Sequence, residues 1–280
     1  MTFHITEGAP DSSVLLHVPH SSRVVPGHVR ERILLDDAGL AAELDHMTDS
    51  HTDLIAAHAA ARTEAWQFTN RLSRLVVDPE RFPDEREEMR AVGMGAVYTR
   101  TSHGAPLRQD DPRHERTLLE AYFEPYAAAM TAAVQDRLEA TGRAVVIDVH
   151  SYPGAPLPYE LHGDGPRPAV CLGTDAFHTP PWLLEAARDA FAPCGEVGLD
   201  SPFAGTYVPL KHYGAVREVS ALMVEIRRDR YMTEPGGAPT AGLGPIADAL
   251  AALVTAVGAH RGRSGSGSAD DGGSGADGLR

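Results

Sequence analysis

The chain has 280 residues, enough for one large α/β domain or two small ones with a well-buried core. Its formal net charge of −14 argues against a nucleic-acid or anionic-membrane partner. The two cysteines cannot build a disulfide framework, whereas the 14 histidines are many for this length and favour metal chemistry. No apolar run approaches a membrane span and the first residues lack a secretory pattern, so we expect a cytoplasmic protein.

The first predicted strand leads directly to a histidine. Residues 13–19 form an apolar run that Pro19 stops, and His20 follows where the strand opens into a loop. His17 lies inside the strand and is interpreted as a packed core residue. Helices are predicted next, over 38–47 and from 53 to 61, because apolar side chains recur at helical spacing.

Between these helices lies the polar segment Thr48-Asp49-Ser50-His51. Aspartate is a good helix-capping residue, and for Asp49 taken alone capping is the better explanation. His51 taken alone is best explained as a surface or packing residue. Each side chain also offers ligand atoms to a metal, and the residues leave open which of the two would bind.

A second strand is predicted over residues 72–78, stopped by Pro79. Arg74 inside it and Arg81 just beyond need partners, and a substrate carboxylate would supply one in bidentate geometry. For Arg81, an ion pair with a nearby acid is an equally good explanation. Residues 82–112 are rich in proline, glycine and charge, which predicts a long surface segment that is either a functional lid or disordered.

The clearest helix, residues 113–141, is predicted to end at Gly142 and to lead into a central strand at 145–149. This β-branched run is typical of a buried strand. Asp148 and His150 come at its carboxyl end, where open α/β sheets place their chemistry. Because residues i and i+2 share one face, Asp148 is expected to orient His150 as a metal ligand. A core-edge histidine beside a turn aspartate is the alternative.

The remaining elements are predicted as short strands at 159–162 and 169–173, a helix at 181–191, a polar loop at 201–214, a strand at 219–226 and a helix at 243–260. Glu225 lies in the last strand among apolar residues, where an isolated carboxylate is costly unless it is paired, metal-linked or functional. An ion pair with Arg227 or Arg228 is the alternative. Residues 263–280 are rich in Gly, Ser and Asp and are interpreted as a disordered tail outside a domain of residues 1–262.

Strands and helices interleave, which predicts an α/β sheet with covered faces. The absence of a GxGxxG or Walker motif argues against nucleotide chemistry. His20, His150 and either Asp49 or His51 are the candidate ligands, and two histidines with one carboxylate form a catalytic zinc set. Glu225 near such a set could act as general base, and nearby arginines would bind an anionic substrate. The combination predicts metal-assisted hydrolysis of an amide on a small acidic molecule.

The motifs that carry a family resemblance fall between about Val14 and Met232: Val18-Pro19-His20-Ser21, Thr48-Asp49-Ser50-His51, Ser73-Arg74-Leu75-Val76-Val77-Asp78 with Arg81, Asp148-Val149-His150-Ser151, His212-Tyr213-Gly214, and Glu225 followed by Tyr231-Met232. In this ordered set the chain resembles the N-formylglutamate amidohydrolases, relatives of the zinc carboxypeptidases and aspartoacylases. The resemblance implies a phosphorylase/hydrolase-like α/β fold with a mixed central sheet. It also implies a zinc ion at His20, Asp49 and His150, with Glu225 as the base. Asp49 thereby becomes the favoured ligand, although His51 remains a competitor.

One motif departs from the family pattern. Where the family usually has Asp-Leu-Asn-Arg, this chain has Asp78-Pro79-Glu80-Arg81, so an acid that would repel a substrate carboxylate replaces an amide. Either Glu80 points away from the site, or the substrate differs from N-formylglutamate at that end.

The resulting hypothesis is a zinc-dependent amidohydrolase that cleaves an N-formyl or N-acyl amino acid. Arg74 and Arg81 are expected to recognise a substrate carboxylate, with Lys211 or His212 near the reacting carbonyl. The alternatives are a zinc peptidase-like amidase acting on another amide, and a non-catalytic homologue that acts as a binding protein.

Overall fold

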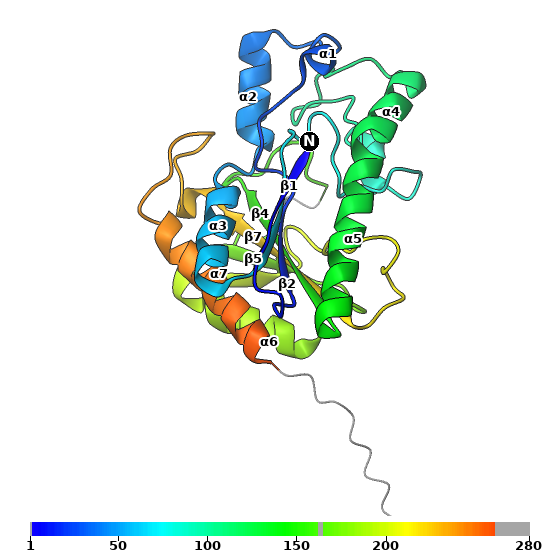
Figure 1. Cartoon of the computed structure of the whole chain (residues 1–280). Helices are drawn as coiled ribbons and strands as arrows, with labels where there is room; N and C mark the ends of the chain where they lie inside the picture. Colours follow the sequence, from blue (N-terminus) through cyan, green and yellow to red (C-terminus); the bar gives the residue numbers. More distant parts are fainter. Residues whose placement is uncertain (1, 162–164, 261–280) are drawn as a thin grey trace, which may run out of the picture.

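A mixed β-sheet forms the centre of the computed structural model, which describes residues 2–161 and 165–260 (Figure 1). Its strands follow the order β1-β3-β2-β4-β7-β5-β6. Their bounds are β1 (Phe3–Thr6), β2 (Val14–Val18), β3 (Trp66–Asn70), β4 (Ala144–Tyr152), β5 (Val170–Gly173), β6 (Val197–Leu199) and β7 (Val219–Arg227). The helices are α1 (Gly27–Arg30), α2 (Asp37–Met47), α3 (Thr52–Thr63), α4 (Pro112–Leu118), α5 (Glu124–Thr141), α6 (Pro181–Phe191) and α7 (Leu243–Ala259).

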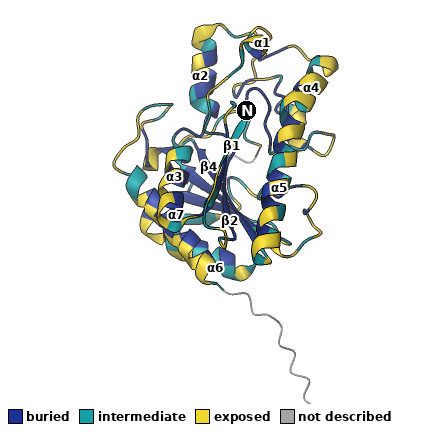
Figure 2. Ribbon diagram, in the orientation of Figure 1, coloured by how far each residue is buried: buried dark blue, intermediate teal, exposed yellow. Residues whose placement is uncertain are grey.

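The strand directions confirm the expectation of a mixed sheet. Strands β3, β2, β4 and β7 are parallel to one another. At the edges, β1 runs antiparallel to β3, and β5 runs antiparallel to β7 with β6 parallel to β5. The parallel strands occupy the middle, where helices cover both faces, as the predicted α/β class requires (Figure 2).

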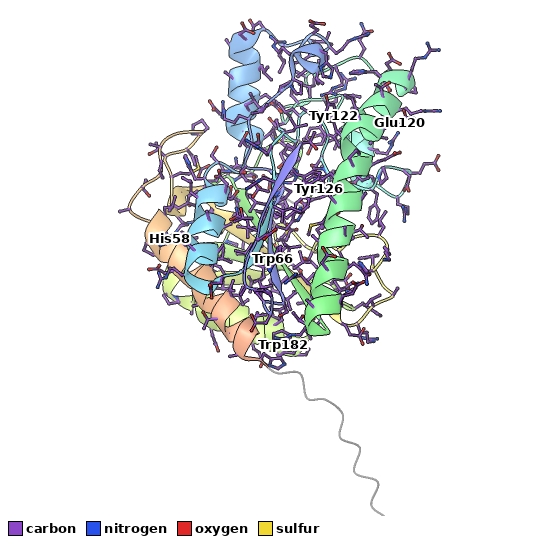
Figure 3. All side chains as sticks on the ribbon, in the orientation of Figure 1. His58, Trp66, Glu120, Tyr122, Tyr126 and Trp182 are labelled. Carbon is purple, nitrogen blue, oxygen red and sulfur yellow. The ribbon has the colours of Figure 1, made fainter. Side chains whose placement is uncertain are left out.

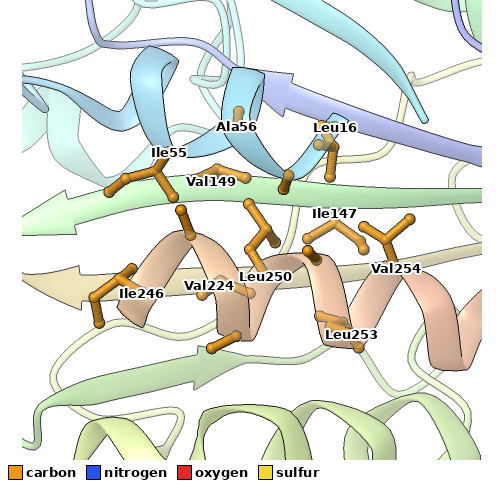
Figure 4. Packing of buried hydrophobic residues seen from close by; sticks show 14 of the residues in the cluster. Leu16, Ile55, Ala56, Ile147, Val149, Val224, Ile246, Leu250, Leu253 and Val254 are labelled. Atoms are coloured by element: carbon orange, nitrogen blue, oxygen red, sulfur yellow. The ribbon is translucent and has the colours of Figure 1, made fainter. Parts of the chain in front are cut away.

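One face of the sheet packs against α3, α6 and α7. Alternate residues of the central strands, such as Leu16, Ile147 and Val224, point to this side and meet Leu250 of α7 (Figure 4). This layer is continuous and apolar, since a strand sends every second side chain to the same face. It is the main hydrophobic core of the domain.

The opposite face packs against α5 and changes character along the strands. Near the strand starts it is apolar, with Leu15, Val146 and Ala221 in one cluster with Tyr126 of α5 (Figure 3). Further along the same strands and face come polar side chains: His17, Asp148, His150 and Glu225. The register places His17 beside Asp148 and His150 beside Glu225. The fold therefore gathers these polar groups at the carboxyl ends of parallel strands.

The long helix predicted over 113–141 is present, with one irregularity. A π-helical turn, Leu119–Phe123, lies between α4 and α5 without interrupting the chain's helical course. Asp111 caps the start by accepting from the backbone N–H groups of Arg113 and His114. Gly142 ends α5 with φ 77°, a left-handed conformation that glycine adopts at little cost.

The prediction of a strand over residues 72–78 is wrong. This segment forms turns, with the Val76 N–H bonded to the Ser73 carbonyl, and it takes no part in the sheet. Leu75 and Val76 are fully buried because they pack into clusters on either side of the turn. Burial, not strand pairing, explains their apolar character. The chain instead supplies β3, which pairs with β1 and β2.

Smaller corrections concern the segments that surround the site. Strand β4 continues to Tyr152, so His150 lies inside the strand and not beyond its end. Residues 159–161 form turns, not a strand, and His162 lies outside the described residues. The predicted tail, 263–280, also lies outside them.

The segment from 82 to 112 is mostly irregular, as predicted, but it is packed. It contains a 3-10 helix, Glu88–Val92, and buries Met94, Tyr98 and Leu107 completely. These side chains share a core cluster with apolar residues of α2. The segment therefore forms a layer over the carboxyl ends of the strands. In the part of the chain that the structure describes, no helix is long and apolar enough to cross a membrane.

Candidate functional site

Three side chains from distant parts of the sequence converge where β2 and β4 end. Nδ1 of His20 lies 3.3 Å from Nδ1 of His150, and Oδ2 of Asp49 lies 3.1 Å from Nδ1 of His150 and 3.7 Å from Nδ1 of His20. All three side chains are almost completely buried. Two imidazole nitrogens and a carboxylate oxygen at such spacing could hold a divalent cation.

Carboxylates lie behind both imidazole rings. Nε2 of His20 is 2.9 Å from Oδ1 of Asp78, and Nε2 of His150 is 3.1 Å from both Asp148 and Glu80, although neither contact of His150 has hydrogen-bond geometry. A carboxylate only accepts, so it favours a proton on Nε2 and leaves the lone pair on Nδ1. Asp148 thus contacts His150, as the i, i+2 argument predicts.

Asp49 owes its orientation to an arginine. Arg228 donates from Nη2 to Oδ1 of Asp49 at 2.9 Å, and its other contacts are the carbonyl of His46 at 2.5 Å and the hydroxyl and carbonyl of Ser151. Burial alone would raise the pKa of Asp49, but the adjacent rings of His150 and His20 and the guanidinium of Arg228 outweigh it and hold that pKa below its ordinary value. Oδ2 is left facing the imidazoles as an ionised oxygen.

The competing residue His51 lies elsewhere. Its Nε2 bonds the carbonyl of Gly237 at 2.9 Å, and the residue precedes α3 with a left-handed φ of 69°. The side chain of Asp49 does not cap that helix. The geometry therefore brings Asp49, and not His51, to the two imidazoles.

Glu225 lies next to His150 in the sheet and lines the cavity beside it. Its Oε2 is buried without a hydrogen-bond partner among the described residues. Burial raises the pKa of Glu225 to about 7, against the opposing effect of His150. The alternative ion pairs are not formed in the described structure, because Arg228 binds Asp49 and Arg227 binds Asp229. A carboxyl group tuned near neutrality and facing a cavity is suited to proton transfer.

Glu80, the residue that departs from the family pattern, points into the site. Its Oε2 lies 3.1 Å from Nε2 of His150 and 3.7 Å from Nε2 of His20, and its Oε1 lies 3.5 Å from Nδ1 of His17. Burial and the nearby Asp148 carboxylate raise the pKa of Glu80. The idea that Glu80 points away is therefore wrong.

Glu80 also offers alternative cation sets, with His20 and His150 or with His17 and Asp148. We favour Asp49 as the ligand because Nε2 of His20 is already bonded to Asp78. His17 is likewise engaged, by Asp148 at 2.9 Å and by the hydroxyl of Tyr126 at 2.5 Å. Among the described residues, Asp49 is the carboxylate within ion-pair distance of Nδ1 of both His20 and His150.

The proposed substrate-binding residues differ in how available they are. Arg74 is bonded to Asp78 through Nε and Nη2, at 3.2 and 2.7 Å, and to the Tyr98 hydroxyl. Arg81 forms the alternative ion pair with a nearby acid, since its guanidinium lies 3.6 Å from Glu87, and it also lies 3.7 Å from Asp78. Both contacts are longer than those of Arg74, and Arg81 lines the cavity with a quarter of its side chain exposed. Arg81 is therefore the better placed of the two to bind an anion.

Lys211 and His212 are separated by the fold. Lys211 lines the cavity and donates to the side chain of Gln135 at 3.0 Å. His212 is buried and is not part of the cavity wall, and neither of its ring nitrogens has a hydrogen-bond partner in the described structure. This placement does not favour direct contact between His212 and a substrate.

The residues that hold Asp49 and Asp148 in place were not predicted from the sequence. Arg228 was considered only as a partner of Glu225, and His17 only as a core residue. The signal for His17 was its strand parity, since it points to the opposite face from Leu16 and Val18. Nothing in the local pattern around Arg228 points to Asp49, which is 179 positions away.

A cavity of about 600 Å³ opens beside this cluster. His150, Glu225, Arg74 and Glu80 lie in its wall, together with residues of α5 and of the segment between β6 and β7. The cluster is thus accessible to a small molecule although its side chains are largely buried.

Comparison with known proteins gives a family and a fold. The chain matches the family model of N-formylglutamate amidohydrolases over residues 12–232. The crystal structure of an N-formylglutamate amidohydrolase from Ralstonia eutropha JMP134 superimposes with a TM-score of 0.77 at 20% sequence identity, covering 91% of this chain and 96% of that one. A gene product of Agrobacterium tumefaciens gives a TM-score of 0.69 at 19% identity, with coverages of 91% and 94%. No curated protein matches the chain.

The ion pair between Arg228 and Asp49 leads to a stability prediction. Arg228→Met leaves Asp49 as a buried carboxylate without its arginine, so the free energy of unfolding should fall by about 3–5 kcal/mol. Urea unfolding measures the loss. The control is Arg62→Met, because Arg62 and its partner Asp248 are half exposed and should contribute little. An equally small effect at Arg228 would show that this pair does not hold Asp49 in place.

Proposed function

The chain belongs to the N-formylglutamate amidohydrolase family, and we propose that it hydrolyses the amide bond of an N-formyl or N-acyl amino acid with a zinc ion held by His20, Asp49 and His150. Amide hydrolysis follows from the family. The ion, its ligands and the substrate are our inference from the geometry of the cluster.

The observation that carries the zinc assignment is the spacing of the ligand atoms. A tetrahedral zinc ion with bonds of about 2.0–2.2 Å places neighbouring ligand atoms roughly 3.3–3.5 Å apart. The separations among Nδ1 of His20, Nδ1 of His150 and Oδ2 of Asp49 are 3.1, 3.3 and 3.7 Å. A carboxylate lies behind each ring, as is usual for zinc-binding histidines: Asp78 is bonded to His20, and Asp148 lies 3.1 Å from Nε2 of His150.

The chemistry is divided between the ion and the protein. When bound, zinc would lower the pKa of a coordinated water to about 7 and polarise the amide carbonyl. Glu225, which lines the cavity beside His150 and has an unpartnered Oε2, accepts a proton from the attacking water and delivers it to the leaving nitrogen. Arg81 binds the carboxylate of the substrate, and Lys211 adds positive charge on the same cavity wall.

Metal loading tests the ligand set. His150→Ala and Asp49→Ala should each lose stoichiometric zinc, as measured by elemental analysis of purified protein, while circular dichroism shows a folded α/β protein. His51→Ala is the matched control and should keep its zinc, because His51 bonds the backbone of Gly237 instead. Retention of zinc by Asp49→Ala together with its loss from His51→Ala would reverse the assignment.

Substitution of Glu225 by glutamine, its amide analogue, tests the role of this residue. Glu225→Gln keeps the shape of the side chain and removes the base, so kcat should fall by roughly 10²–10⁴-fold with zinc content and unfolding unchanged. Glu88→Gln is the control, since Glu88 lines the same cavity but is exposed and distant from the sheet face. Near-normal turnover by Glu225→Gln would mean that the base is another group.

A comparison of substrates with and without a free carboxylate tests the roles of Arg81 and Arg74. Arg81→Met should weaken kcat/KM for acidic N-acyl amino acids by about 1.5–3 kcal/mol, or roughly 10- to 150-fold, and affect substrates without a free carboxylate much less. Arg74→Met should instead lower the free energy of unfolding, because it removes the two hydrogen bonds that Arg74 donates to Oδ2 of the buried Asp78. An equal loss for both substrate types in Arg81→Met would make Arg81 structural.

A further inference from the structure

The cavity extends beyond the polar cluster along α5. Tyr207 marks the transition, because its backbone N–H donates to Asp148 at 3.4 Å and its ring lies 4.8 Å from that of His17. Past this point the segment from 203 to 213 runs beside α5, to which Lys211 is bonded through Gln135 (Figure 1). Both segments contribute to the cavity wall.

The walls of this extension, which we call the α5 arm, are mainly apolar. They consist of Phe123, Ala127 and Ala128 on the helix side and Val208, Pro209 and Leu210 on the other. Thr131 and Lys211 are polar residues on the same two segments. The arm therefore differs from the cluster of carboxylates and imidazoles with which it is continuous.

Two large side chains at this part of the cavity are exposed. Leu210 is 51% exposed and Tyr213 45% exposed, and both belong to the cavity wall. Single exposed apolar residues are common on protein surfaces. Here they adjoin an apolar recess, so that a ligand lying in the arm would cover them as well.

The size of the cavity exceeds what the polar cluster needs. At about 600 Å³ it falls within the range of roughly 300–1,000 Å³ that holds drug-sized ligands. The reacting amide and one carboxylate are accounted for by the cluster and Arg81. A formyl group adds only a carbon and an oxygen, which leaves the α5 arm unused.

We propose that the substrate carries a bulky apolar substituent, either a long N-acyl group or a large apolar side chain, which binds in the α5 arm. This inference rests on the proposed function and names the substrate class within it. Each methylene that the arm buries should raise kcat/KM about fourfold, until the arm is filled.

The experiment compares two substrate series with the zinc-loaded full chain. One lengthens the acyl group on glutamate from formyl to acetyl, butyryl and hexanoyl, and the other enlarges the side chain of an N-formyl amino acid from alanine to leucine and phenylalanine. At least one series should show a rising kcat/KM. Turnover that is flat or falling in both series would overturn the inference and leave the proposed function intact.

Substitutions in the α5 arm test whether the rise of kcat/KM with substituent size arises there. Ala128→Phe fills the arm from an exposed helix position, so it should abolish the gain for the bulky substrate and change the smallest substrate less than twofold. Leu210→Asp should do the same by charging the opposite wall. Ala140→Phe is the matched control on α5, because Ala140 is exposed and lies outside the cavity wall. A gain that survives both arm variants would place the apolar group elsewhere.

A binding measurement keeps the test independent of turnover. Calorimetric titration of Glu225→Gln protein with the same series should show a dissociation constant that falls with the size of the substituent. Affinity that rises with size, together with no hydrolysis of either series by the unsubstituted protein, would refute the proposed function but support the arm. Affinity independent of size would refute the arm.

Discussion

The arrangement of the polar cluster at the carboxyl ends of the strands depends on the contacts of one carboxylate, that of Asp78. It is fully buried and accepts hydrogen bonds from His20, Arg74 and the hydroxyl of Tyr98, while its Oδ1 also accepts from the backbone N–H of Glu80. Burial alone would raise the pKa of Asp78, but Arg74 and His20 outweigh it and hold that pKa well below its ordinary value. One buried charge thereby orients a ring of the proposed metal site and anchors the turn that brings Glu80 to it.

The carboxylates around the cavity have different environments, and these environments separate their chemistry. Asp49 and Asp148 face the imidazole of His150, and Asp78 binds Arg74, so that the pKa of each lies below its ordinary value despite burial. Glu80 and Glu225 form no ion pair with an arginine in the described structure, and burial raises the pKa of both. The groups with a lowered pKa are suited to hold rings and cations, and those with a raised pKa to exchange protons.

Much of the fold and part of the site could be predicted because short-range patterns encode them. The helix at 181–191 was predicted to its last residue, since Pro181 suits a first turn and the apolar spacing is regular. The pairing of Asp148 with His150 follows from strand parity, and the isolated charge of Glu225 in an apolar strand marks a residue with a special environment. The turn at 72–78 misled the prediction, because its apolar residues are buried by packing rather than by strand pairing.

The amino-acid sequence by itself determined the α/β class and the candidate residues His20, His150 and Glu225, because strand ends and local periodicity are properties of neighbouring residues. The order of its short motifs also determined the family resemblance. Only the tertiary structure brought Asp49, and not His51, beside the two imidazoles, and only it placed the side chain of Glu80 within the site. Those outcomes depend on contacts between residues far apart in the chain, such as the bond between Arg228 and Asp49. No local pattern specifies such a contact, since its energy exists only once the sheet has brought the two groups together.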